Sequence, residues 1–235
     1  MEHPVMLLVW LLEKVGLGHF AHAYRHLVYA WFFAIVLIIL ALIATRHLQR
    51  IPGNLQLLFE LLLDNMYKFQ ETIMGKRGMV FFPMIMTLMI FVFVCNFNGL
   101  IPGSYAPTSD LNTTLAYALM IVFLTHFMGF KIHGIKYLKH FMGPSPFLAP
   151  LMFVVELVSH AARVVSLSFR LFGNVLGEDL VVAILFMLAG QYFLPLPMMF
   201  MGLFTGFLQA YIITLLAMVY IGEAMEDEGE EEEAH

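Results

Sequence analysis

Arg170 lies in the segment Ser166-Leu167-Ser168-Phe169-Arg170-Leu171-Phe172-Gly173-Asn174, inside an apolar stretch that runs from residue 144 to residue 189. After Pro150 this stretch contains no proline, so about 40 residues can form one helix roughly 60 Å long at ~1.5 Å per residue. The hydrocarbon core of a bilayer is about 30 Å thick, so a helix of this length must be strongly tilted in a membrane. Inserting an arginine at the centre of a membrane helix costs about 2.5–3.5 kcal/mol, which makes Arg170 a candidate functional residue.

The composition of the chain is that of an integral membrane protein. Hydrophobic residues make up 61% of the sequence and charged residues 12%, with a mean hydropathy of +0.84. A soluble domain is closer to about 45–50% apolar and about 25% charged. Several apolar runs reach about 20 residues, enough to cross a bilayer as helices. The sequence therefore predicts an all-α membrane protein.

Most of the chain, residues 26–222, is predicted to form one membrane-embedded domain between two short terminal segments. Residues 1–25 include an apolar stretch suited to an interfacial helix, with Trp10 near the lipid headgroups. Residues 223–235 hold eight of the 17 acidic residues and no basic one, which favours a solvated, disordered tail. Without that tail the remaining 12 basic residues outnumber the acidic ones.

The apolar runs predict an ordered series of helices. Three ordinary spans are expected first, at residues 26–45, 79–97 and 113–130. Residues 54–73 are periodic but carry four charges, and we expect this helix to lie at the membrane surface. The last two helices, residues 150–189 and 198–220, are expected to form a strongly inclined hairpin.

Basic residues in the loops predict the orientation of these spans. The segment between the first two spans holds five of them, and the loop at residues 98–108 holds none. Three lysines follow the third span: Lys131, Lys136 and Lys139. The loop at 98–108 and the N-terminus are therefore expected outside the cell, and the acidic tail in the cytoplasm. The compact length and acidic tail favour the plasma (inner) membrane of a bacterium.

A polar stripe is expected along the 150–189 helix. Residues seven apart drift by only about 20° on a helical wheel, so Glu156, Arg163 and Arg170 share one side. Four further residues fall on that side: His160, Leu167, Asn174 and Glu178. Asp179 lies about 180° from Arg170, so one helix can present a cation to one neighbour and a carboxylate to another compartment. Such a separation suits ion transport across a dividing barrier.

Structural roles for the same residues are weighed beside this interpretation. Arg163 is suited to brace the helix by pairing with Glu156 or His160. His160 alone is more typical of a satisfied interior histidine than of a metal ligand, and no cluster has convincing metal-site spacing. Arg170 is also open to a structural pairing.

The segment 166–174 closely resembles the signature of subunit a of the F-type ATP synthase membrane sector. Further stretches resemble the same family in the same order, and together the likeness covers residues 40–221: Asn96-Phe97-Asn98-Gly99-Leu100-Ile101-Pro102-Gly103, Pro107-Thr108-Ser109-Asp110-Leu111-Asn112-Thr113-Thr114, the basic loop from Gly134 to Pro144, and Leu208-Gln209-Ala210-Tyr211.

The resemblance implies a role for each matching residue. Arg170 matches an essential arginine that faces the ring of c subunits and blocks direct proton flow between two half-channels. Asp179 matches a position that lines a half-channel, whereas Gly202 stands where some members carry a histidine or an acid. The remaining proton-path candidates are Glu156, His160, Asn174, Glu178, Gln209 and Asp110. The polar stripe, Leu167 included, is expected to face the ring.

The resemblance also implies the partners of the chain. It would act in the stator beside the c-subunit ring, the b-subunit peripheral stalk and other subunits, coupling protons or Na⁺ ions to rotation. No cofactor, metal or nucleic acid is expected. The chain has no Gly-x-x-x-x-Gly-Lys-Ser/Thr loop, so nucleotide chemistry would belong to other subunits. Two other functions are considered: a cation/proton antiporter, which often shows internal repeats, and a structural scaffold.

Overall fold

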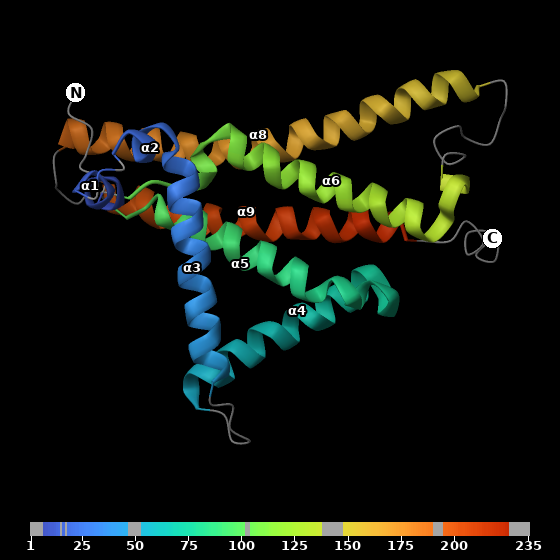
Figure 1. The fold of residues 1–235 in the computed structure, drawn as a ribbon, viewed down its shortest axis with the longest axis horizontal. Helices are drawn as coiled ribbons and strands as arrows, with labels where there is room; N and C mark the ends of the chain where they lie inside the picture. Colours follow the sequence, from blue (N-terminus) through green and yellow to red (C-terminus); the bar gives the residue numbers. More distant parts are fainter. Residues whose placement is uncertain are drawn as a thin grey trace.

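A computed structural model describes residues 7–14, 16, 18–46, 53–101, 104–137, 148–189 and 195–225. Within these residues the chain is built from helices and short 3₁₀ turns (Figure 1). Their bounds are α1 Leu7–Lys14, α2 Gly18–Ala23, α3 Arg25–Thr45, α4 Asn54–Gly78, η1 Met79–Phe81, α5 Phe82–Asn98, η2 Pro107–Ser109, α6 Leu111–His133, η3 Gly134–Lys136, α8 Ala149–Ala189 and α9 Pro195–Glu223. Most of the predicted basic loop at 134–144 and of the acidic tail lies outside the described residues.

Five stretches in this part of the chain are long and apolar enough to cross a membrane. They correspond to the three predicted spans and to both helices of the predicted hairpin, which confirms the all-α membrane class. The second stretch, Phe59–Asn98, joins α4, η1 and α5. Glu223, which the sequence analysis assigned to the tail, is the last residue of α9.

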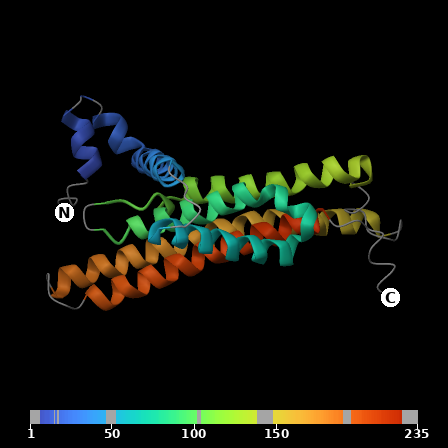
Figure 2. The same ribbon diagram turned by 90° about the horizontal axis from the view of Figure 1, so that it is seen from below.

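The long helices α8 and α9 lie side by side and antiparallel, as both views show (Figures 1 and 2). Helix α5 packs on α9 and α6 packs on α8, so these four helices form one elongated bundle. Helix α3 runs across the long direction of the bundle in Figure 1. If α3 crosses the bilayer upright, the 41-residue α8 is therefore strongly inclined, as its length of about 60 Å requires.

Small residues of α9 are buried in the bundle. Ala210 and Ala217 are fully buried, and their small side chains let neighbouring helix backbones come near. On α8 the buried residues Leu167, Leu171 and Val175 recur every four positions, so they form one apolar face. The two faces join the same core cluster, which fixes how α8 is turned about its axis.

Helix α4 packs into the bundle along part of its length. The ring of Phe69 stacks on that of Tyr211 in α9 at 5.4 Å, and Met66 and Met74 are buried in the core cluster. The charged side chains of Asp64 and Lys68 pair with each other at 2.7 Å and stay exposed. The predicted surface helix is thus amphipathic: part of its apolar side is buried in the core cluster, whereas Phe59 and Leu62 stay exposed. Gly75, with a positive φ of 62°, bends the chain where α4 approaches α5.

The N-terminal helices α1 and α2 pack beside the loop that follows α5. Buried Val9, Ala21 and Tyr29 form a second apolar cluster against Tyr105. The Arg25 guanidinium lies over the Tyr105 ring at 4.7 Å. The N-terminal segment and the loop at 98–108 therefore lie on the same side of the molecule, as the distribution of basic residues predicts.

Candidate functional site

Arg170 projects from α8 with its side chain exposed. Its Nη2 donates a long hydrogen bond of 3.4 Å to Ser166 Oγ, one turn earlier on the same helix. None of the ion pairs within the described residues involves Arg170. Arg170 is therefore not held by an ion pair with an acid of the described chain. Its guanidinium faces outward from α8.

One turn beyond Arg170, an amide pair connects α8 to α9. Asn174 Nδ2 donates to Gln209 Oε1 at 2.9 Å. Gln209 is 3% exposed, and its Nε2 has no hydrogen-bond partner among the described residues. Both predicted polar positions thus lie together, with one buried donor left to bind a group such as water.

The predicted polar stripe of α8 mainly faces α9, and little of it lies on the exposed face of α8. Leu167 is 3% exposed and belongs to the core, so the expectation that it faces outward with Arg170 is wrong. Asn174 and Glu178 both contact α9 through hydrogen bonds. Arg170 stands at the exposed edge of the stripe because it lies about 60° from Leu167 around the helix.

Glu178 and Asp179, the acid pair, point toward different neighbours. Glu178 accepts a hydrogen bond from Thr205 Oγ1 of α9. A Cβ added to Gly202 would lie 3.3 Å from Glu178 Oε2, so Glu178 occupies space that a side chain at 202 would need. A Cβ added to Gly99, at the end of α5, would lie 3.0 Å from Asp179 Oδ1. Both carboxylates are half-buried beside glycines.

A buried polar network lies near the acid pair. Its residues are not among the site residues predicted from the sequence. Asn96 Nδ2 donates to the Gly206 carbonyl of α9 at 3.2 Å, and Thr108 Oγ1 donates to Asn96 Oδ1 at 2.8 Å. Thr114 and Ser168 share a further hydrogen bond of 3.2 Å between α6 and α8. An asparagine inside an apolar span was the available signal, because polar groups in membrane helices usually have functional or pairing roles.

Asp110 has two local partners. It caps α6 by accepting a hydrogen bond from the Asn112 backbone N–H at 2.9 Å. Its other oxygen, Oδ2, lies 3.3 Å from His26 Nδ1 at the start of α3. These contacts give Asp110 a structural role at the side of the molecule where the N-terminal helices lie.

At the other end of α8, two histidines and two further titratable groups form the histidine cluster: Glu156, His160, His126 and Tyr137. His160 Nε2 lies 3.2 Å from Glu156 Oε1. The His126 ring of α6 meets the His160 ring with centroids 4.5 Å apart, and His126 Nδ1 lies 3.0 Å from the Tyr137 hydroxyl. Burial raises the pKa of the Tyr137 phenol, and the nearby Glu156 adds to this, so Tyr137 stays a hydrogen-bond donor.

Arg163 pairs with α9 instead of with its own helix. Its Nη1 donates to Glu223 Oε2 at 3.2 Å, and its guanidinium lies over the Tyr220 ring at 4.6 Å. The expected brace therefore exists, but its partners are not the Glu156 and His160 that the sequence analysis named. Arg163 ties the last turn of α9 to α8.

These groups divide α8 into three parts. The histidine cluster and the acid pair are separated by 18 residues between His160 and Glu178, or about 27 Å along the helix. Arg170 lies between them. Titratable groups thus lie at two ends of α8, with one exposed cation between them. Such an arrangement can take up a proton at one end and release it at the other if a separate proton carrier moves past Arg170.

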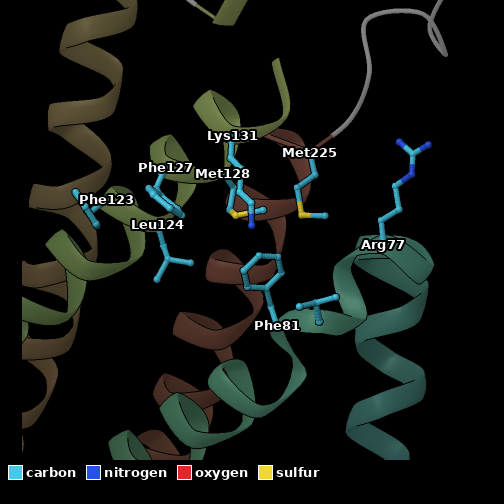
Figure 3. A pocket seen from close by; sticks show the side chains of 9 residues that line it. Arg77, Phe81, Phe123, Leu124, Phe127, Met128, Lys131 and Met225 are labelled. Atoms are coloured by element: carbon cyan, nitrogen blue, oxygen red, sulfur yellow. The ribbon is translucent and has the colours of Figure 1, made fainter. Parts of the chain in front are cut away.

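A separate pocket of about 510 Å³ lies between η1, α6 and the end of α9 (Figure 3). Its walls are mainly apolar, from Phe81, Phe127, Met128 and Met225, with Lys131 also lining it. It contains none of the predicted proton-path residues.

Comparison with known proteins identifies what this chain is similar to. A family profile described as ATP synthase A chain matches residues 27–222. The chain is 45% identical over 226 residues to ATP synthase subunit a of Desulfosudis oleivorans, covering 96% of this chain and 99% of that protein. It is 46% identical to the subunits a of Syntrophobacter fumaroxidans, over 96% of this chain, and of Trichlorobacter lovleyi, over 97%, in each case covering 99% of the relative.

Proposed function

The chain belongs to the ATP synthase subunit a family, which acts in proton translocation, and from this premise we propose that Arg170 separates the two half-channels of its proton path. The exposed guanidinium without an ion-pair partner in the described chain, placed between the acid pair and the histidine cluster, carries this proposal.

The carrier that passes Arg170 is a ring of c subunits, each with one carboxylate in the membrane. A carboxylate in hydrocarbon is most stable when it is neutral. Arg170 offers an opposite charge, so a carboxylate that reaches it releases its proton and takes one up again after leaving. The same cation repels protons, which prevents direct flow between the half-channels. A membrane potential supplies about 2.3 kcal/mol per charge per 100 mV to drive this cycle.

We assign the acid pair to the outer half-channel. Asp179 carries protons there and Glu178 assists, while Asn174 and Gln209 hold polar contacts between this path and Arg170. The acid pair lies near Gly99, at the end of α5 that leads into the loop at 98–108. That loop packs against the N-terminal helices, which we place outside a bacterial plasma membrane, with the C-terminal tail in the cytoplasm.

Glu156 and His160 belong to the inner half-channel under the same proposal. They lie near the end of α6 and the last turn of α9, which is the side where the basic loops are expected to face the cytoplasm. The remaining partner is the b-subunit stalk, which would hold this chain still while the ring turns.

Replacing Arg170 tests the proposal directly. Arg170→Ala should abolish ATP synthesis and ATP-driven proton pumping in membrane vesicles, while the complex still assembles. Arg170→Lys should also fail substantially, because a compact ammonium does not reproduce the wide, always-charged guanidinium. Normal synthesis by Arg170→Ala vesicles would rule out the assignment.

Crosslinking tests the ring as the partner. Cysteines at Phe169, which is 55% exposed, and at the exposed Asn174 should crosslink to cysteines on c subunits. A cysteine at the buried Leu167 is the matched control and should not react. Crosslinks from Leu167 alone would show that the side of α8 that is buried in this structure faces the ring.

A further inference from the structure

We propose that His126 and His160 act together as a two-imidazole proton relay at the inner end of the proton path. This inference rests on the proposed function and adds a second helix, α6, to it. The two rings belong to different helices, yet their centroids lie only 4.5 Å apart.

The contacts of the two rings form a continuous series of titratable groups. Glu156 Oε1 lies 3.2 Å from His160 Nε2, the two imidazoles meet, and His126 Nδ1 lies 3.0 Å from the Tyr137 hydroxyl. The Glu156 side chain is 33% exposed and that of His160 is 14% exposed. Accessibility thus falls from the carboxylate to the imidazole, as expected where a proton enters from water.

The pair lies among charges of both signs. The Glu156 carboxylate on α8 lies 3.2 Å from His160, and the cationic Arg163 on α8 is paired with Glu223 of α9. Tyr137, the residue after η3, faces His126 and is a neutral hydrogen-bond donor. Two adjacent imidazolium rings repel each other, so the pair titrates as a unit.

The relay step conserves protons and charge. During ATP-driven pumping, a proton from the cytoplasm binds the Glu156 carboxylate and transfers to His160 Nε2. One ring of the charged pair then releases one proton, which travels along water molecules toward the c-subunit carboxylate near Arg170, about 15 Å further along α8. Glu156 ends ionised and both imidazoles end neutral, so each group is ready for the next proton. During synthesis the same steps run in reverse.

A histidine pair is an unusual way merely to pack two membrane helices. Apolar residues would fill the same contact without placing ionisable groups within membrane-spanning helices, where such groups are expensive and usually functional. Imidazole is also the side chain that gains and loses a proton near neutral pH, which is the property that a relay requires.

The test is ATP-driven proton pumping by inverted vesicles, which expose the cytoplasmic side, between about pH 6 and about pH 9. Replacing both histidines by glutamine should slow pumping by about tenfold at the alkaline end, where water supplies few protons, and much less at the acid end. His160→Ala leaves room for a free imidazole, so added imidazole should restore much of its rate. His22→Gln, a histidine on α2 at the other side of the molecule, is the matched control and should not change the profile.

Two outcomes would overturn the relay. One is a pH profile of the double variant that matches the unaltered complex. The other is a loss that is equal at every pH and is not restored by imidazole, which would indicate a packing role. Where the double variant does not assemble, His126→Asn alone supplies the same pH comparison. If vesicles with Arg170→Ala still pump protons, the proposed function itself is wrong. Failure of the relay and failure of the proposed function are therefore distinguished by different variants.

Discussion

The two ends of α8 hold their titratable side chains in different ways. The acid pair lies half-buried between α5 and α9, beside Gly99, Gly202 and a hydroxyl from Thr205. The histidine cluster instead joins α6 to α8 through imidazoles and leads to the partly exposed Glu156. One end therefore depends on space left by small residues, and the other on contacts between titratable side chains of two helices.

This difference predicts at which end of α8 a single substitution slows proton transport more. At the acid pair a carboxylate has few substitutes, because the neighbouring network of Asn96 and Thr108 consists of groups that do not titrate near neutral pH. At the histidine cluster four titratable groups lie close together, and Glu156 is partly exposed. We therefore expect larger losses from single changes at the acid pair.

The largest of these losses is expected from Asp179→Asn. Removing a proton-transferring group from a path without a substitute should slow proton-driven ATP synthesis by about 100-fold or more, and Asp179→Glu should retain part of the rate. Synthesis rates in vesicles with equal amounts of complex measure this. If Asp179→Asn runs normally and Glu178→Gln stops, the two acids must exchange roles. If neither change slows synthesis, the outer path runs through other residues.

A smaller effect is expected from Gly202→Ala. The new Cβ would lie 2.7 Å from Leu100 Cδ2 and 3.3 Å from Glu178 Oε2, so both side chains must move. Because the end of a leucine side chain is flexible, we expect assembly to persist and synthesis to fall by a few-fold. Gly222→Ala on the same helix is the control, since its nearest contact is an ordinary 3.8 Å to Met74 Cγ. Equal rates for the two variants would show that Glu178 needs no space at Gly202.

The smallest effect is expected from Glu223→Gln at the other end of the bundle. The Arg163–Glu223 pair is partly exposed, and such pairs contribute about 0–1 kcal/mol. Pumping should therefore change by less than about twofold, and the thermal stability of the purified complex only slightly. A loss as large as that of Asp179→Asn would mean that Glu223 is part of the proton path and that the brace is not its only role.

The sequence alone predicted the helices and most candidate residues, because both depend on local information. The apolar run of α3 and the length of α8 are visible without a partner helix. The brace partner of Arg163 was missed because Glu223 is 60 residues away, and a helical wheel gives direction but not which neighbour lies there. His126 was missed for the same reason, since its meeting with His160 depends on how α6 packs on α8.

The orientation of the polar stripe was also beyond the sequence. The wheel placed Leu167 and Arg170 on one side, but the stripe is wide enough for Leu167 to enter the core while Arg170 remains exposed. The burial of Leu167, Leu171 and Val175 in the core and the hydrogen bonds from Asn174 and Glu178 to α9 accompany that rotation. Only the packed helices show which edge of the stripe is free.

The sidedness of the two ends of α8 can be measured with single cysteines in a Cys95→Ala background. Thr205→Cys lies beside Glu178, and Ser159→Cys lies next to His160 in the chain; both positions are half-buried. A membrane-impermeant thiol reagent is applied to right-side-out and to inverted vesicles. We predict that Thr205→Cys reacts only from the outer side and Ser159→Cys only from the cytoplasmic side, because Arg170 divides the two paths. Reaction of both cysteines from the same side, or of either cysteine from both sides, would contradict two separate half-channels.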